Sequence, residues 1–315
     1  MPSPVVPIEI RDSENGDALV RSGVVAAFFL EPFIDEASEA LSTVFDRFVA
    51  TVPTGELRWA MPSATSEHWK KVDEKLLDRM RSSLTPAAST GKKSRKRRFT
   101  AFTINDSGEH APQYSLTISD RDAAEDGAAS RTLLQMTFPL SAAETGSVET
   151  LVSLVEETTT RLKPAYGYVS PALLPAEGSR QAAFARMRPI TMRHPGYDVP
   201  MNELAQLDIG ARTRGARWIT LLGPALLQQL GGLDSLRRFA SSELELRDLG
   251  GTALLRAGKT PEIGDTEQGI PTPGLRSLAR VLEPVTLFGE VNLLSYFAAF
   301  DEGVLRAWER RFLDP

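Results

Sequence analysis

Residues 210–224, GARTRGARWITLLGP, combine two glycine-led basic triplets with an apolar run that ends at Gly223-Pro224. Glycine and arginine can form a phosphate-binding loop, but such a loop must open a helix whose N-terminus faces the phosphate. The apolar run has the length and composition of a buried strand. We therefore expect the arginines to fix a loop by bonding carboxylates or backbone carbonyls, and the large apolar side chains to enter the core. These are Arg212, Arg214 and Arg217, and Trp218, Ile219, Leu221 and Leu222.

Outward from this stretch, apolar residues recur at helical spacing in some segments and alternate with polar ones in others. Before it we expect strands at residues 23–30, 99–104, 114–118 and 132–138, and helices at 37–49, 65–84, 148–162 and 180–187. After it we expect short helices at 224–232 and 233–239, a hairpin at 244–258 and a long helix at 291–312. The short connections between the strands at 99–138 favour an antiparallel meander.

Strands and helices mix without strict alternation, which predicts an α+β fold of mixed, largely antiparallel sheets with covering helices. Residues 170–180, SPALLPAEGSR, are rich in proline and small residues, a composition typical of a boundary. We therefore expect an N-terminal α+β lobe at residues 1–172 and a C-terminal α+β lobe at 173–315.

The composition excludes several classes of function. With 36 Lys and Arg against 41 Asp and Glu, the net charge of -5 gives no broad positive field for nucleic acid or anionic lipid. The absence of cysteine excludes disulfides and thiolate catalysis. The start of the chain lacks the pattern of a signal peptide, and the apolar run at 24–30 is far shorter than the ~20 residues that span a bilayer. We expect a cytoplasmic protein that contacts neither membrane nor nucleic acid.

No motif predicts catalysis. The sequence ALLRAGKT ends like a phosphate-binding loop, but Ala253 stands where that motif needs glycine, and Pro261 follows instead of a helix. The three histidines, His68, His110 and His194, lack metal-ligand spacing, and no Gly-x-Ser-x-Gly motif is present. We predict no catalytic, cofactor-binding or metal-binding residues, so the protein is expected not to be an enzyme.

Two kinds of charged segment remain. Residues 92–98, KKSRKRR, suit either a nucleic-acid contact or a solvated loop, so a nucleic-acid-binding protein or an enzyme that uses this run is the alternative function. The acidic segments SDRDAAEDG and GDTEQG are either polar turns or contacts for a basic surface on a partner. The candidate partner-binding residues are Asp120, Asp122, Glu125, Asp126, Asp265 and Glu267.

The series RHPGYDVP (193–200), LDIGARTRGARWITLLGPALLQQLGG (207–232) and GGTALLRAGKTPEIGD (250–265) resembles the TsiV family of type VI secretion immunity proteins, near its TsiT-like members. The resemblance covers residues 20 to 290, and it implies one immunity domain in a cytosolic, non-enzymatic protein without a cofactor. Its implied partner is a cognate antibacterial effector, usually a nuclease toxin. Inhibition could cover the toxin's active site, block its substrate groove or prevent its assembly.

Overall fold

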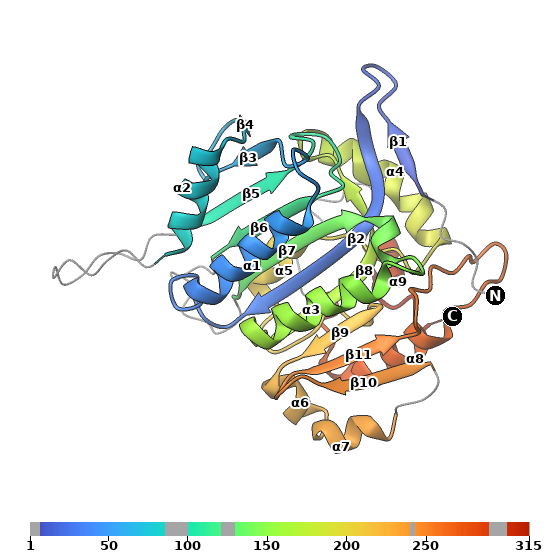
Figure 1. Cartoon of the computed structure of the whole chain (residues 1–315). Coiled ribbons are helices and arrows are strands. Elements are labelled where there is room, and N and C mark those ends of the chain that lie inside the picture. The colour runs from blue at the N-terminus through green and yellow to red at the C-terminus, as the bar shows by residue number, and fades with distance from the viewer. Residues whose placement is uncertain (1–6, 86–99, 121–129, 240–242, 290–300, 315) are drawn as a thin grey trace.

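The computed structural model describes residues 7–85, 100–120, 130–239, 243–289 and 301–314. Within these residues the strands form one eleven-stranded sheet in the order β10-β11-β9-β8-β2-β7-β6-β5-β3-β4, with β1 paired to β2 (Figure 1). Every strand pairing is antiparallel, which confirms the predicted α+β class with a largely antiparallel sheet. In chain order the strands are β1 Glu9–Arg11, β2 Ala18–Leu30, β3 Trp59–Met61, β4 Lys70–Lys71, β5 Ala101–Asn105, β6 Ser115–Ser119, β7 Thr132–Pro139, β8 Tyr166–Pro175, β9 Ile219–Leu222, β10 Leu244–Asp248 and β11 Ala253–Ala257.

Helices cover the sheet on both faces. One face packs against α1 Ser38–Thr51, α2 Glu74–Leu84 and α3 Val148–Leu162. On the other face, α5 Asn202–Asp208, α6 Pro224–Gln229, α7 Gly232–Arg237 and α8 Pro273–Leu282 contribute to a second apolar core. A third cluster joins the start of β2 to α4 Arg180–Arg193 and α9 Glu302–Glu309.

The apolar run of β2 is buried because both faces of this central strand are covered. Successive side chains of a strand point to opposite faces. Val24, Ala26 and Phe28 therefore enter the core under α1 and α3, whereas Val25, Ala27 and Phe29 enter the opposite core. The predicted meander is also confirmed, because β5, β6 and β7 pair consecutively and antiparallel.

The proline-rich segment that suggested a boundary is part of β8, which lies between β2 and β9. The backbone carbonyl of Pro171 accepts a hydrogen bond of 2.8 Å from the amide nitrogen of Asp198. The nitrogen of Pro171 faces the same side, away from β2, so its missing N–H costs no bond to that strand. The division into lobes at residues 172 and 173 stays a prediction, and this point lies inside β8.

Two helix predictions differ from the structure. The segment at 65–84 is not one helix: β4 precedes a helix that begins at Glu74, where the side chain of Asp73 accepts a 2.7 Å hydrogen bond from the amide of Leu76. That N-cap stops the helix from extending further toward the N-terminus. Within the long helix predicted at 291–312, the described residues form α9 from Glu302 to Glu309, and residues 290–300 lie outside the described part.

Candidate functional site

The three arginines of residues 210–224 bond to carboxylates or backbone carbonyls of the same chain, as expected. Arg217 Nη2 lies 2.9 Å from Asp198 Oδ1, and Arg214 Nη1 lies 3.6 Å from Asp198 Oδ2. Arg214 Nη1 also donates a 3.0 Å hydrogen bond to the Tyr168 hydroxyl, and Arg212 donates to a backbone carbonyl one turn earlier. The four large apolar residues of the stretch are buried in the core. Its predicted structural role is confirmed.

The charges of this buried network are fixed near neutral pH. Burial opposes ionisation of Asp198, but the guanidinium groups of Arg217 and Arg214 outweigh it and hold the pKa of this carboxyl at about 2. Burial raises the pKa of the Tyr168 hydroxyl well above its ordinary value. Asp198 is therefore ionised and Tyr168 neutral, so the network holds the fold together without exchanging protons.

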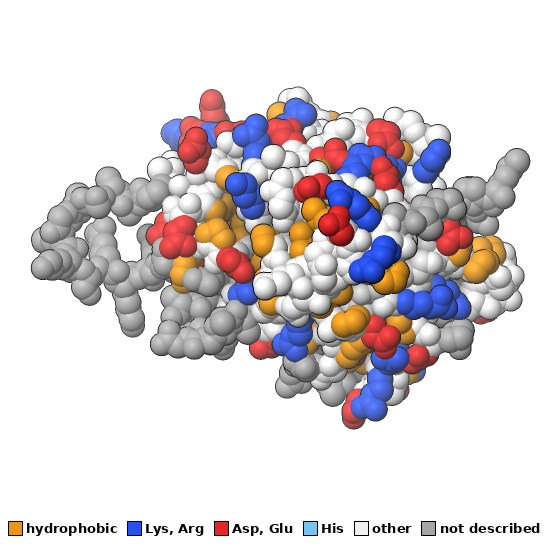
Figure 2. Space-filling model, turned by 90° about the horizontal axis from the view of Figure 1, so that it is seen from below, with side chains coloured by type: hydrophobic (Ala, Val, Ile, Leu, Met, Phe, Trp, Pro, Cys, Tyr) orange, Lys and Arg blue, Asp and Glu red, His pale blue; other side chains and the backbone are white. Residues whose placement is uncertain are grey.

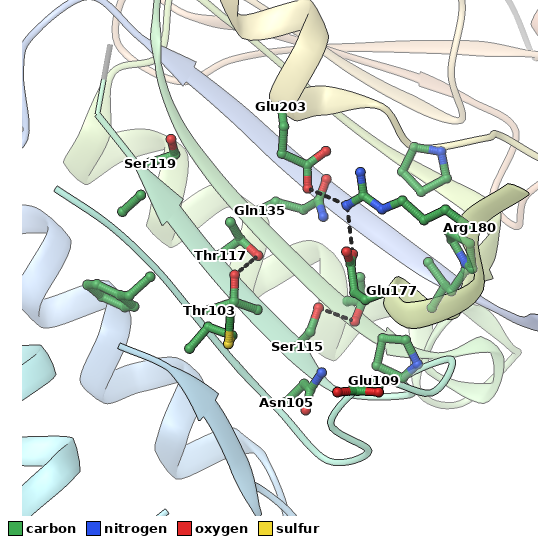
Figure 3. A pocket seen from close by; sticks show the side chains of 18 of the residues that line it. Thr103, Asn105, Glu109, Ser115, Thr117, Ser119, Gln135, Glu177, Arg180 and Glu203 are labelled. Atoms are coloured by element: carbon green, nitrogen blue, oxygen red, sulfur yellow. Dashed lines mark hydrogen bonds and ion pairs between the residues drawn. The ribbon is translucent and has the colours of Figure 1, made fainter. Parts of the chain in front are cut away.

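A polar groove of about 500 Å³ lies on the face of β5, β6 and β7 opposite the core under α1 and α3 (Figure 3). Strand alternation separates the two faces: Ile104, Leu116 and Met136 enter that core, whereas their polar neighbours form the floor of the groove. The floor consists of Thr103, Asn105, Ser115, Thr117, Ser119, Gln135 and Thr137.

Cross-strand pairs organise this floor. Thr103 and Thr117 face each other in the register of β5 and β6, and their hydroxyls are 3.0 Å apart. The hydroxyls of Ser115 and Thr137 are 2.9 Å apart across β6 and β7. Gln135, opposite Thr117 on β7, extends the first row toward α5. The groove therefore presents hydrogen-bonding groups where most sheet faces bury apolar ones.

The rim of the groove is acidic. The charged residues that line it are Glu67, Glu109, Glu177, Glu203 and Arg180. Arg180 Nη2 lies 2.8 Å from Glu177 Oε1 but 3.8 Å from Glu203 Oε1 (Figure 3). Burial raises the pKa of Glu203, and the negative charge of Glu177 raises it further. These effects outweigh the lowering by the positive charge of Arg180, so the pKa of Glu203 lies above its ordinary value. Because one arginine stands against four glutamates, the groove attracts cations.

Apolar side chains form the walls on both sides of the polar floor. Met61 and Trp69 lie on the side of β3, whereas Phe184, Met201 and Leu204 lie on the side of α4 and α5. Such walls suit the aliphatic stem of a long cationic side chain, which buries its carbons and leaves its charge in a polar setting. The groove therefore fits a basic protein surface better than a polyanion.

The acidic residues expected to contact a partner do not line this groove. Asp120 is 4% exposed, and its carboxylate accepts hydrogen bonds from the Ile34 amide at 3.2 Å and the Thr132 hydroxyl at 3.3 Å. Asp265 is 5% exposed and accepts from Arg193 at 2.8 Å. Both carboxylates thus serve internal contacts.

Glu267 is exposed and pairs with Arg193 at 2.7 Å. Asp122, Glu125 and Asp126, like the basic run at 92–98, lie outside the described residues. A role of these acidic residues in partner binding stays a prediction.

Other surfaces offer less. Figure 2 shows basic and acidic side chains intermingled over one face, with hydrophobic ones in small groups between them. In the described part of the chain, no three His, Asp or Glu side chains are placed to hold a metal ion. No helix within the described ranges is long and apolar enough to cross a membrane.

Comparisons with known proteins agree with this architecture. A family model, TsiV, described as type VI immunity for VRR-NUC, matches residues 40–312. A solved structure titled "Pseudomonas aeruginosa T6SS protein PA0821" superposes with a TM-score of 0.78 at 20% sequence identity. The match covers 98% of this chain and 88% of that chain, and at this identity it shows a shared fold. No curated protein matches the chain.

Proposed function

Because the chain belongs to the TsiV family, the type VI immunity proteins for VRR-NUC, we propose that it binds a nuclease effector of that class and neutralises it by covering the surface that takes nucleic acid. The resemblance seen in residues 193–265 is thereby confirmed at the level of the family. Binding and mode of inhibition are our proposal. The cytoplasm, where a nuclease effector finds nucleic acid, is the proposed place of action.

The observation that carries the proposal is the glutamate-rimmed groove over β5, β6 and β7. A nuclease must hold a polyanion, and it does so largely with lysine and arginine side chains that contact phosphates. A surface that presents glutamates and hydroxyl groups is complementary to such a cationic site. The same charges repel nucleic acid, which supports a protein partner for this groove.

The groove is the centre of the proposed interface and does not form all of it. A stable complex buries about 1,200–2,000 Å² of total surface, and a few central residues carry most of the binding energy. Walls from β3, α4 and α5 flank the floor, so a partner seated there also reaches these elements. Neutralisation by this route needs no chemical step from the immunity protein.

Co-expression with a cognate VRR-NUC effector tests the proposal. The wild-type chain should co-purify with the effector and restore growth. Thr117→Arg places a bulky cation on the groove floor and should weaken both effects. The matched control, Thr160→Arg, alters an exposed threonine on α3 at the opposite face and should protect like the wild type.

Failure of the wild-type chain to co-purify and protect would contradict the proposed function. Full protection by Thr117→Arg at equal protein level would place the interface elsewhere on the molecule.

A further inference from the structure

We propose that Glu177, Glu203 and Gln135 form a subsite for one arginine of the effector and a backbone carbonyl beside it, and that Arg180 occupies the cation position in the free protein. This inference rests on the proposed function and names the chemistry of one contact within it. Three independent features of the groove support it: the sharing of Arg180, the orientation of Gln135 and the apolar wall beside them.

The guanidinium of Arg180 lies near two carboxylates, those of Glu177 and Glu203. The same nitrogen of Arg180 is 2.8 Å from Glu177 and 3.8 Å from Glu203, so only Glu177 is within hydrogen-bond distance of it. Glu203 carries its charge in a partly buried position at the start of α5. A second guanidinium would give Glu203 a short, charge-assisted hydrogen bond that the free protein lacks from Arg180.

The second feature is the Gln135 amide, whose direction follows from the buried network. Arg214 only donates hydrogen bonds, so the Asn202 atom at 2.9 Å from its Nη1 must be the amide oxygen. The Asn202 nitrogen then donates to Gln135 Oε1 at 2.6 Å. Because Gln135 Oε1 accepts this hydrogen bond, Gln135 Nε2 is the amide atom that is available to the groove (Figure 3).

Gln135 is 8% exposed, and Nε2 has no hydrogen-bond acceptor among the described residues. Because this nitrogen reaches the groove, a carbonyl of a ligand seated there can accept a hydrogen bond from it. Asn202, which bonds Gln135, directly precedes Glu203 in α5, and Gln135 and Glu203 both line the groove.

The ligand must therefore offer a cation and an acceptor side by side. An arginine in an extended or loop segment does so, because its guanidinium reaches the carboxylates while an adjacent backbone carbonyl reaches Gln135 Nε2. Arginine suits the two glutamates better than lysine because its planar fork can bond both at once. Phe184 and Leu204 on the groove wall would pack against its aliphatic stem.

A double-mutant cycle on effector affinity, measured by titration calorimetry, tests the subsite. Glu203→Gln should weaken binding about tenfold because it removes the charge-assisted contact. Gln135→Met should weaken it by a factor of about 2 to 10, the range of one neutral hydrogen bond. Glu157→Gln on α3, a partly exposed glutamate also near arginines, is the matched control and should bind like the wild type.

Arg180→Gln should tighten binding, since it removes the internal competitor for the two carboxylates. The effector arginines are then replaced by glutamine one at a time. One of these effector variants should bind the wild-type chain more weakly but bind Glu203→Gln no more weakly than the unchanged effector does, because that arginine and Glu203 are coupled. Wild-type affinity retained by Glu203→Gln and Gln135→Met would overturn the subsite alone. Weaker binding by Arg180→Gln would overturn the inference that Arg180 occupies the cation position in the free protein. Absence of wild-type binding would overturn the proposed function and the subsite together.

Discussion

Removal of the Asp198 carboxylate should destabilise the protein more than loss of any surface charge. Asp198 is fully buried, 2.9 Å from Arg217 and 3.6 Å from Arg214, and it accepts a 2.8 Å hydrogen bond from the Tyr168 hydroxyl. Asp198→Ala leaves these two arginines as buried cations without their carboxylate. Breaking a buried pair in this way costs about 3–5 kcal/mol, a large part of the ~5–15 kcal/mol that stabilises a typical domain.

Urea unfolding at neutral pH, followed by circular dichroism, measures this cost. Asp234→Ala is the control: this carboxylate is 92% exposed in its pair with Arg237, so its loss should change the free energy of unfolding by less than about 0.5 kcal/mol. A loss below about 1 kcal/mol for Asp198→Ala would show that Asp198 contributes no more than an isolated surface ion pair, which stabilises a protein by at most about 1 kcal/mol.

The pH dependence of the same free energy gives an independent check. The pKa of Asp198 is depressed in the folded protein, from an ordinary 3.8 to about 2. Its contribution is therefore present above the unfolded pKa and is lost as the pH falls from about 4 toward 2. That loss amounts to about 2–3 kcal/mol and should be missing in Asp198→Ala.

Two further predictions concern the groove and the fold. Burial raises the pKa of Glu203 above its ordinary 4.5, although the charge of Arg180 lowers it in part. A bound cation favours the ionised form of Glu203. Effector affinity should therefore fall as the pH drops through that raised pKa. A calorimetric pH series checks this, and an identical slope in Glu203→Gln would contradict it. Gly196→Ala should lower stability by about 1–3 kcal/mol, since its Cβ would lie 2.0 Å from the Glu262 carbonyl oxygen. Thermal unfolding measures the loss, with Gly303→Ala in α9 as the control that should not lower the midpoint, because its Cβ meets only a side-chain atom at 3.4 Å.

The core elements could be predicted from the sequence because their signals are local. The apolar run of residues 218–222 and the basic triplets before it indicated a buried strand after an arginine-fixed loop, and the structure confirms both. The partner of two of those arginines, Asp198, was not predicted. Its loop is held beside them by contacts distant in the sequence, such as the parallel bridge that Asp198 makes with Ala172 in β8.

The groove was not predicted, although part of its signal is present in the sequence. In β5 and β6, threonine and serine alternate with apolar residues, which is typical of a strand with one polar face. Nothing local showed that this face is hollowed or that Glu177, Arg180 and Glu203 meet beside it. Their meeting depends on β8, whose prolines suggested a boundary, and on α5, which the sequence patterns did not predict.

In the proposed function, the groove over β5, β6 and β7 covers the nucleic-acid surface of a VRR-NUC effector. Fluorescence anisotropy of a labelled DNA duplex bound to a catalytically inactive form of the effector tests this mode of inhibition. The wild-type chain should release the duplex at near-stoichiometric amounts, whereas Thr117→Arg should release it poorly. A stable ternary complex, in which the immunity protein binds while the duplex stays bound, would rule out this mode of inhibition.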